Sequence, residues 1–291
     1  MRKKVLITGG SGFVGSHIAD QLLNKGFQPI IFDKVRSKYL KKNQIFLKGD
    51  ILNFGLLEKA IKGCDYVYHF AGLSDLNDAV KKPLKSVKLN ILATVKLLDL
   101  CLKYKIKRFV YASSIYVNSK EGGFYRSSKK AAEEYIEEYK NIFDLRFTVL
   151  RFGSLYGSRS QKNNGLNKIL DKAFRHKKIQ YQGTIKSVRE YINAEDAARA
   201  SVKILKKKYE NKYIIVTGNK KVKLVELLKY LKDILKIKTK IKFSNIHTSY
   251  LGHYVANPFT YKPYVGKKLK IKNQKNFFKE IDNYIKNKGF E

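Results

Sequence analysis

Short hydrophobic runs alternate with longer periodic segments through the first half of the chain. The short runs are β-branched or aromatic and apolar at nearly every position, which is typical of strands buried on both faces. They are KVLIT (4–8), PIIFD (29–33), QIFLKG (44–49), DYVYHF (65–70), RFVYAS (108–113) and FTVLRF (147–152). Apolar residues recur at helical spacing between them, over 14–25, 53–62, 84–104 and 126–140. This alternation predicts an α/β fold with a Rossmann-type doubly wound parallel sheet.

The alternation breaks up after about residue 152. YIIVTG (213–218) followed by LVELLKYLKDIL (224–235) predicts one more strand and helix, and the remainder is basic and rich in loops. We expect a smaller, interleaved C-terminal substrate domain that caps the carboxyl edge of the sheet. The expected boundaries are 1–152 with a return of about 186–208 for the NAD-binding domain, and 153–185 with 209–291 for the smaller one.

Composition fits a folded protein of the cytoplasm. Hydrophobic residues make up 44% of the 291 residues and aromatic residues 13%, which argues against disorder. The two cysteines, Cys64 and Cys101, form neither a metal-ligand spacing nor a disulfide framework. The N-terminal stretch MRKKVLITGG has no apolar region of signal-peptide length, and no later segment is apolar enough to span a bilayer. We therefore expect a cytoplasmic location, no membrane insertion and no metal.

The formal net charge of +37 has two interpretations. It could serve an anionic partner, such as nucleic acid or a phosphorylated substrate. It could instead reflect drift towards lysine, because Ile, Asn and Tyr are also abundant while tryptophan is absent. The lysines are scattered along the chain and do not gather in one tail, which favours drift. No nucleic-acid partner is expected.

A glycine-rich turn follows the first predicted strand. Gly9, Gly12 and Gly15 lie three residues apart where the strand should pass into a helix. Glycine there allows a tight turn, close approach of backbone to a pyrophosphate and close packing of helix on strand. Asp33, at the end of the second strand, would accept hydrogen bonds from an adenosine ribose and repel a 2′-phosphate. Asp33 therefore favours NAD over NADP, although three cations follow it: Lys34, Arg36 and Lys38.

Further blocks appear in a fixed order: KGDI, DYVYHFAGL, VKLNILATVKLLD, LRFGSLYGSR and VREYINAEDAARA. With the glycine turn, they resemble the extended short-chain dehydrogenase/reductase superfamily, particularly its NAD-dependent nucleotide-sugar epimerases and dehydratases. The resemblance runs from residue 3 to about residue 200. The cofactor-binding residues that it implies are Gly9, Gly12, Phe13, Gly15, Asp33, Asp50 and Ile51 at the adenine, Phe70, Ala71, Gly72, Asn90, Tyr125 and Lys129. The substrate-binding residues that it implies are Ser74, Ser114, Ser154 and Arg189, the last at the substrate diphosphate.

The resemblance implies a catalytic set of Tyr125, Lys129 and Ser114. Tyr125 and Lys129 are four residues apart, so on a helix they share one face. A phenol is a poor base at neutral pH, and a neighbouring ammonium would lower its pKa. The tyrosinate could then remove a proton from a sugar hydroxyl while the carbon gives a hydride to NAD, with Ser114 hydrogen-bonded to the same oxygen.

Several positions depart from the family pattern. The serine is kept, but SSIYVNS stands where the family has Val-Tyr-Gly after it. The gap from Ser114 to Tyr125 is also short, so one wall of the sugar pocket should be open or reshaped. The dehydratases have an Asp-Glu pair where this chain has Ile115 and Tyr116, which argues against a 4,6-dehydratase. Two substrate-binding positions are also changed, an asparagine to Ser154 and a lysine to Ser74.

We expect an NAD-dependent nucleotide-sugar 4-epimerase or 4-dehydrogenase that acts on a GDP- or UDP-linked sugar. A 4-ketoreductase and a non-catalytic RNA- or protein-binding relative are the alternatives. The resemblance also implies a homodimer through helices 84–104 and 126–140. Their apolar residues could instead serve the core of one chain: Leu97, Leu98, Cys101, Tyr135 and Tyr139. Around His253 and Tyr254, aromatic residues could either stack on a nucleotide base or pack the small domain.

Overall fold

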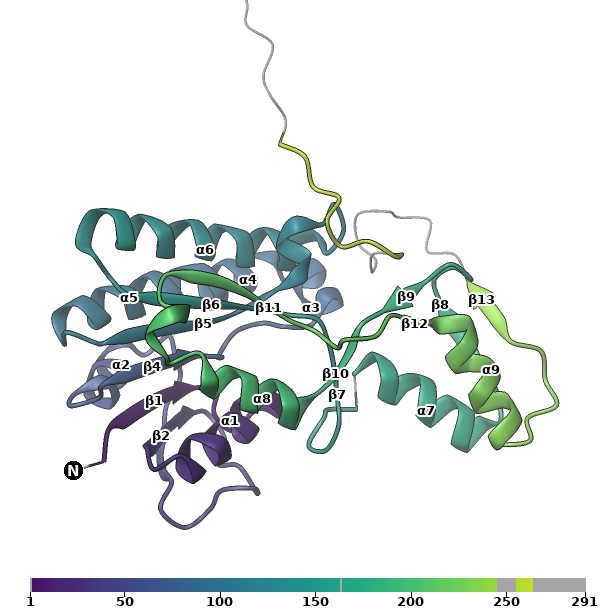
Figure 1. The fold of residues 1–291 in the computed structure, drawn as a ribbon, viewed down its shortest axis with the longest axis horizontal. Helices are drawn as coiled ribbons and strands as arrows, with labels where there is room; N and C mark the ends of the chain where they lie inside the picture. Colours follow the sequence, from purple (N-terminus) through teal and green to yellow (C-terminus); the bar gives the residue numbers. More distant parts are fainter. Residues whose placement is uncertain (1, 163, 245–254, 264–291) are drawn as a thin grey trace, which may run out of the picture. The chain divides into compact units, whose positions relative to one another are not determined.

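Parallel strands formed by the buried hydrophobic runs make up the centre of the fold (Figure 1). The computed structural model describes residues 2–162, 164–244 and 255–263. The described residues up to Tyr261 belong to one compact unit, and a second unit begins at Lys262. His253 and Tyr254 lie outside the described residues.

The main sheet has seven strands in the order β11-β6-β5-β4-β1-β2-β3, and every neighbouring pair is parallel. Its strands are β1 (Lys4–Thr8), β2 (Gln28–Asp33), β3 (Ile45–Lys48), β4 (Tyr66–His69), β5 (Arg108–Ser114), β6 (Phe147–Phe152) and β11 (Lys212–Val216). This is the predicted doubly wound order, in which the chain reverses direction across the sheet between β1 and β4. One boundary is corrected: β11, which we assigned to the smaller domain, pairs with β6 at the edge of the main sheet. The rest of the domain division stays a prediction.

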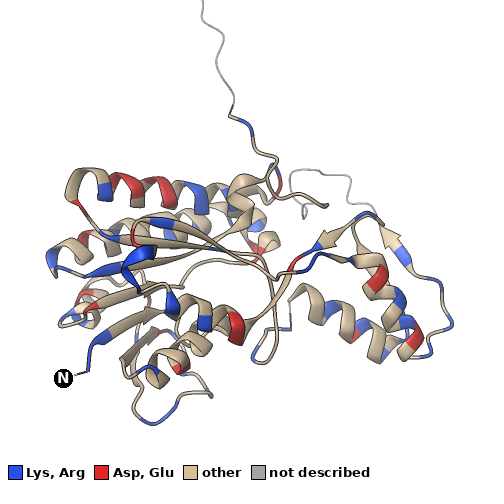
Figure 2. Ribbon diagram, in the orientation of Figure 1, with Lys and Arg blue, Asp and Glu red and all other residues tan. Residues whose placement is uncertain are grey.

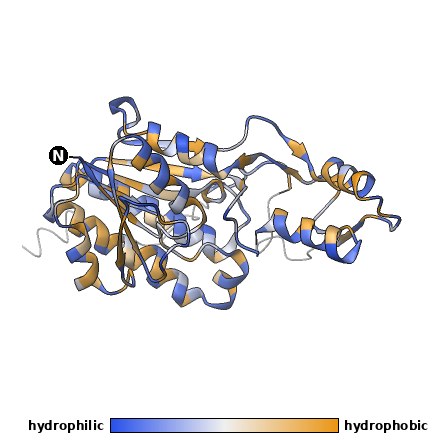
Figure 3. Cartoon of the chain, turned by 90° about the horizontal axis from the view of Figure 1, so that it is seen from below, coloured by the Kyte–Doolittle hydropathy of each residue, from blue (hydrophilic) through white to orange (hydrophobic). Residues whose placement is uncertain are grey.

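Helices cover both faces of the sheet. One face packs against α2 (Phe54–Ile61), α5 (Ala93–Lys103) and α6 (Gly123–Phe143), and the other against α1 (Phe13–Asn24) and α8 (Ala194–Lys203). Hydrophobic residues line the strands and the helix faces turned towards them (Figure 3). The predicted helix 84–104 is in fact α4 (Pro83–Val87), a π-helical turn at Lys88–Leu92 and α5, preceded by a short α3 (Leu76–Lys81). A π-turn adds a residue to the helical register, which the hydrophobic spacing could not reveal.

The region after residue 152 contains more regular structure than we expected. Besides α8, it includes α7 (Gly165–His176) and the predicted α9 (Leu224–Ile234), which share a small core. Three pairs of short strands connect them: β7 (Ser154–Tyr156) with β10 (Tyr191–Asn193), β9 (Val188–Arg189) with β12 (Val222–Lys223), and β8 (Gln180–Gln182) with β13 (Lys242–Ser244). α7 has its apolar residues at helical spacing, at Leu166, Ile169, Leu170 and Ala173, so the expectation of a loop-rich region was wrong here.

Candidate functional site

A cavity of about 1400 Å³ lies at the carboxyl edge of the main sheet, where a doubly wound fold binds its ligands. It extends from the glycine turn after β1 to the short strands and α7. Most of the predicted site residues line it: Gly9, Gly12, Phe13, Gly15, Asp33, Ile51, Phe70, Ala71, Gly72, Ser74, Ser114, Tyr125, Lys129, Ser154 and Arg189. Of the predicted residues, Asp50 and Asn90 are not among the described residues that line it.

The glycine turn needs glycine for steric reasons. Gly9 has φ +72°, and a Cβ atom on it would lie 2.6 Å from the amide nitrogen of Ala71. A Cβ atom on Gly15 would lie 2.3 Å from the carbonyl oxygen of Gly9. Gly12 is the N-cap of α1 and has no side chain to cap the first helical turn. The N–H groups of that turn therefore remain available to an anion, as a dinucleotide pyrophosphate requires.

Asp33 and Asp50 lie at neighbouring strand ends in different settings. Asp33 accepts hydrogen bonds from the backbone N–H groups of Ser11 (3.1 Å) and Val35 (3.3 Å), which hold its carboxylate at the cavity wall. Asp50 instead pairs with the Lys34 ammonium at 2.6 Å and accepts a hydrogen bond from the Leu52 N–H group. Contact between Asp50 and the adenine therefore stays a prediction.

Asn90 does not line the cavity but forms hydrogen bonds that position residues lining it. Its side chain is 1% exposed and bonds both the N–H group (2.7 Å) and the carbonyl oxygen (3.0 Å) of Leu73. Its amide also donates to the Ser128 hydroxyl at 2.9 Å. Asn90 thereby fixes the segment after β4 to α6, so that Gly72 and Lys129 lie side by side: a Cβ atom on Gly72 would be 3.8 Å from Lys129 Nζ.

Ser114, Tyr125 and Lys129 all line the cavity. Burial raises the pKa of Tyr125 to about 12, and a hydrogen bond with Ser114 acts in the opposite direction. Burial lowers the pKa of Lys129 to about 8, and the charge of Glu133 opposes that shift. Lys129 Nζ donates to the carbonyl oxygen of Ala112 at 2.8 Å, which holds the ammonium beneath the site.

A buried ion pair behind the site was not found from the sequence. Glu133, one turn after Lys129 on α6, is 4% exposed. It accepts two hydrogen bonds from Arg151 on β6, at 3.1 and 2.6 Å, and one from the Ser113 hydroxyl. Ser113 therefore has a structural role. The signal in the sequence was a glutamate four residues after the predicted lysine, on the same helical face.

His69 at the end of β4 is also buried. Its ring nitrogens lie 2.7 Å from the Thr8 hydroxyl and 3.0 Å from the Thr94 hydroxyl, and burial, together with the charge of Lys129, lowers its pKa to about 3. It is therefore a neutral structural residue. His176 is exposed at the end of α7.

The end of the cavity away from the glycine turn is polar and basic. Arg189 is 6% exposed, and its guanidinium donates to the Tyr181 hydroxyl at 3.0 Å. Ser154 lies at the start of β7, and Ser74 follows β4. Two lysines of α7, Lys168 and Lys172, line this end as well. No sequence pattern distinguishes these two lysines, because lysine is common throughout the chain.

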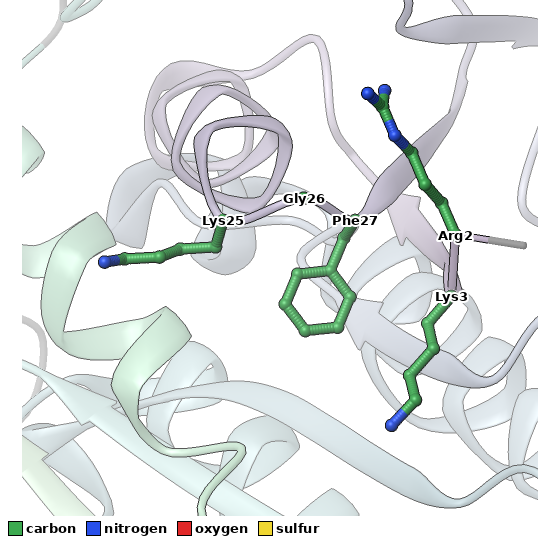
Figure 4. A pocket seen from close by; sticks show the side chains of 5 residues that line it. All are labelled: Arg2, Lys3, Lys25, Gly26 and Phe27. Carbon is green, nitrogen blue, oxygen red and sulfur yellow. The ribbon is translucent and has the colours of Figure 1, made fainter.

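Two other features concern the surface. A smaller hollow at the opposite edge of the sheet is lined by Arg2, Lys3, Lys25, Gly26 and Phe27, whose cationic side chains point in different directions (Figure 4). Lysine and arginine are spread over many of the described elements, whereas acidic residues cluster on α6 (Figure 2). Among the described residues, no helix combines the length and apolar character needed to cross a membrane.

Comparison with known proteins gives consistent matches. The profile of the NAD dependent epimerase/dehydratase family matches residues 5–218. A Methanocaldococcus jannaschii protein provisionally named a UDP-glucose 4-epimerase is 26% identical over 94% of this chain and 98% of its own length. The dTDP-D-glucose 4,6-dehydratase of Dictyostelium discoideum is 31% identical over 70% of this chain and 56% of its own length. A solved structure of the UDP-N-acetylglucosamine 4-epimerase of Methanobrevibacter ruminantium, bound to UDP-N-acetylmuramic acid, has a TM-score of 0.78 at 25% identity, covering 90% of this chain and 93% of that one.

Proposed function

Because this chain belongs to the NAD dependent epimerase/dehydratase family, we propose that it is a nucleotide-sugar 4-epimerase whose base is Tyr125. It is an enzyme of the extended short-chain dehydrogenase/reductase type, and its cofactor is NAD. The observation that supports the reaction is that Ser114, Tyr125 and Lys129 share one cavity with the glycine turn. A 4-dehydrogenase or 4-ketoreductase would use the same three residues.

The residues of the nucleotide end fit a dinucleotide. Backbone atoms of neighbouring segments lie where Cβ atoms on Gly9 and Gly15 would be, so only glycine allows this tight turn. The turn and the start of α1 line the cavity, where the free N–H groups of the helix N-terminus suit a pyrophosphate. Asp33 is held by two backbone N–H groups, which leaves lone pairs of its carboxylate for ribose hydroxyls. When bound, NAD supplies a hydride acceptor, and its reduced form supplies a hydride donor.

Tyr125 would remove the proton of the sugar hydroxyl. With a pKa of about 12 it is protonated at neutral pH, so a nearby positive charge must lower that pKa for catalysis. Lys129 is the buried cation on the same helical face, and its bond to the Ala112 carbonyl oxygen fixes its position. Ser114 would orient the sugar hydroxyl through the hydroxyl group that already contacts Tyr125.

The residues after Ser114 favour an epimerase over a dehydratase. Ile115 and Tyr116 both line the cavity where a dehydratase would need a carboxylic acid and a carboxylate. Neither side chain can supply those groups. The relative that this chain covers almost completely carries an epimerase name, whereas the chain spans only 56% of the dehydratase.

The substrate is a nucleotide diphosphate sugar, with UDP or GDP as the nucleotide. Arg189, Lys168 and Lys172 supply positive charge at the end of the cavity away from the glycine turn, which suits the substrate diphosphate.

The purified protein should be incubated with UDP- and GDP-linked sugars while the absorbance of NADH and the stereochemistry of the product are followed. We expect inversion at C4 of one such sugar without net accumulation of NADH. Net NADH formation would identify a dehydrogenase. If no nucleotide sugar is converted and none reduces the bound NAD, the proposed function is wrong.

A further inference from the structure

The loop between Ser114 and α6 is short, and a distant part of the chain provides hydrogen-bond partners for its backbone. Residues Ile115–Asn118 form a 3-10 turn, and Ser114 Oγ accepts a hydrogen bond from the Tyr116 N–H group at 3.3 Å. Arg126 then bonds the carbonyl oxygens of Ser119 (3.0 Å) and Lys120 (2.7 Å). These contacts leave the carbonyl oxygen of Asn118 and the N–H group of Lys120 in need of partners.

Residues 255–261, which we call the C-terminal strap, provide those partners. The N–H groups of Thr260 and Tyr261 donate to the Asn118 carbonyl oxygen at 2.8 and 2.9 Å. The Thr260 hydroxyl oxygen accepts the N–H group of Lys120 at 2.9 Å. Two cations of α6 face the Tyr261 ring, Lys130 at 3.8 Å and Arg126 at 5.9 Å from its centroid.

The other end of the strap lies at the substrate end of the cavity. The carbonyl oxygen of Val255 accepts the N–H group of Val188 at 2.7 Å and the Arg189 guanidinium at 3.3 Å. The strap therefore connects Arg189, at the diphosphate end, with the loop beside the catalytic tyrosine.

That loop contacts the reacting group directly. The ring of Tyr116 meets the ring of Tyr125 edge to face, with centroids 6.5 Å apart. Displacement of the loop would move both Tyr116 and the hydrogen bond at Ser114 Oγ, which would misalign the base.

We infer that Thr260 and Tyr261 are positioning residues for the reaction. They replace the longer loop of related enzymes by holding the short loop 115–121 against Tyr125. In this role they touch neither substrate nor cofactor. The inference rests on the proposed function. The Thr260 hydroxyl and the Tyr261 ring thus act by holding the backbone of the loop in place. Their loss should lower kcat more than it weakens substrate binding.

The test uses the full-length enzyme with bound NAD and the variant that combines Thr260→Val and Tyr261→Leu. Thr260→Val keeps the shape of the side chain but removes the acceptor for Lys120, and Tyr261→Leu removes the ring. We expect kcat to fall roughly tenfold with KM changed by less than about threefold. The single variant Tyr261→Phe keeps the cation–π contacts, so its kcat should stay within about twofold of that of the unmodified enzyme. Phe259→Ala, at an exposed position of the same strap, is the matched control and should also stay within about twofold.

Amide hydrogen exchange of residues 115–121 provides a readout that needs no substrate. The amide of Lys120 should exchange roughly tenfold faster in the double variant, because its acceptor is gone. Unchanged exchange and unchanged kcat in the double variant would overturn the positioning role. If exchange accelerates but the unmodified protein converts no nucleotide sugar, the proposed function fails while the contact of strap and loop stands.

Discussion

Lys129 shows how a single residue can depend on the whole site. The residue is 5% exposed, and its ammonium bonds the Ala112 carbonyl oxygen and lies 4.6 Å from the centroid of the Tyr111 ring. Burial disfavours the charged form, while Glu133 one turn away favours it. When Lys129 is charged, it can stabilise a tyrosinate beside it. Burial of that charge lowers the free energy of unfolding.

Tyr125→Phe tests the proposed base. The variant keeps the ring but removes the phenolic oxygen, so kcat should fall by roughly a hundredfold or more, while bound NAD and the free energy of unfolding change little. Steady-state kinetics and the absorbance of bound cofactor measure both. Tyr135→Phe, the same change at a half-exposed position of α6, is the control and should retain full activity. Full activity in Tyr125→Phe would exclude Tyr125 as the base.

The lowered pKa of Lys129 predicts a pH-dependent stability. Between its folded pKa of about 8 and the ordinary value of 10.5, the unfolded chain holds a proton that the folded chain has released. Stability therefore rises with pH across that window, since the unfolded state binds more protons. Relative to Lys129→Met, the unmodified protein free of cofactor should gain about 2 kcal/mol of unfolding free energy between about pH 7 and pH 10.

Urea unfolding at both pH values measures this gain. Lys203→Met, at an exposed position of α8, controls for general effects of pH and charge. An equal response of the two variants to pH would show that Lys129 remains charged in the folded protein.

At the level of elements, α6 is fixed to the sheet by a buried ion pair as well as by apolar contacts. Arg151 on β6 binds Glu133 in a bidentate manner, and its guanidinium also faces the Tyr213 ring of β11 at 4.7 Å. The pair therefore joins two neighbouring strands to the helix that holds Tyr125 and Lys129. A shift of α6 would displace both residues together.

Glu133→Gln should lower the free energy of unfolding by about 3 kcal/mol, because it leaves the Arg151 charge without its counterion in a largely buried site. Glu134→Gln makes the same change on the next residue, whose side chain is 68% exposed, and should cost less than about 0.5 kcal/mol. Urea unfolding of the two variants gives the comparison. Equal losses would mean that burial of the pair contributes nothing to its strength.

For the molecule as a whole, the assembly stays a proposal. Leu97, Leu98 and Cys101 are fully buried within one chain, so the alternative that they serve the intrachain core is correct. α6 nevertheless exposes Tyr135, Ile142 and Phe143 by 48%, 66% and 56%. A helix face with such residues is suited to a partner, and a second copy of the chain fits the homodimer that the family resemblance implies.

Light scattering should therefore give about twice the chain mass of 33.7 kDa. Tyr135→Asp places a charge in the proposed interface and should produce a monomer. Tyr230→Asp, the same change at an exposed position of α9, should leave the dimer intact. A monomeric unmodified protein would refute the homodimer.

Local sequence patterns were sufficient to predict the parallel sheet and the glycine turn, and they also led to the proposed reacting residues. Buried parallel strands need continuous apolar runs, and the glycine turn needs Gly9 and Gly15 because no side chain fits there. Each of these requirements involves residues that are close in the sequence, so short stretches of sequence reveal them. The spacing of Tyr125 and Lys129 is local for the same reason.

The contacts that position those residues could be found only from the tertiary structure. The π-turn at Lys88–Leu92, the indirect role of Asn90 and the pairing of Glu133 with Arg151 all depend on contacts between distant segments. The short gap from Ser114 to Tyr125 predicted an open or reshaped pocket wall. That expectation stays a prediction, and the structure adds that residues 260 and 261 lie on this loop, across about 140 positions of chain. Contacts of such range leave no periodic pattern in a single sequence, because each partner satisfies its own local rules wherever the other lies.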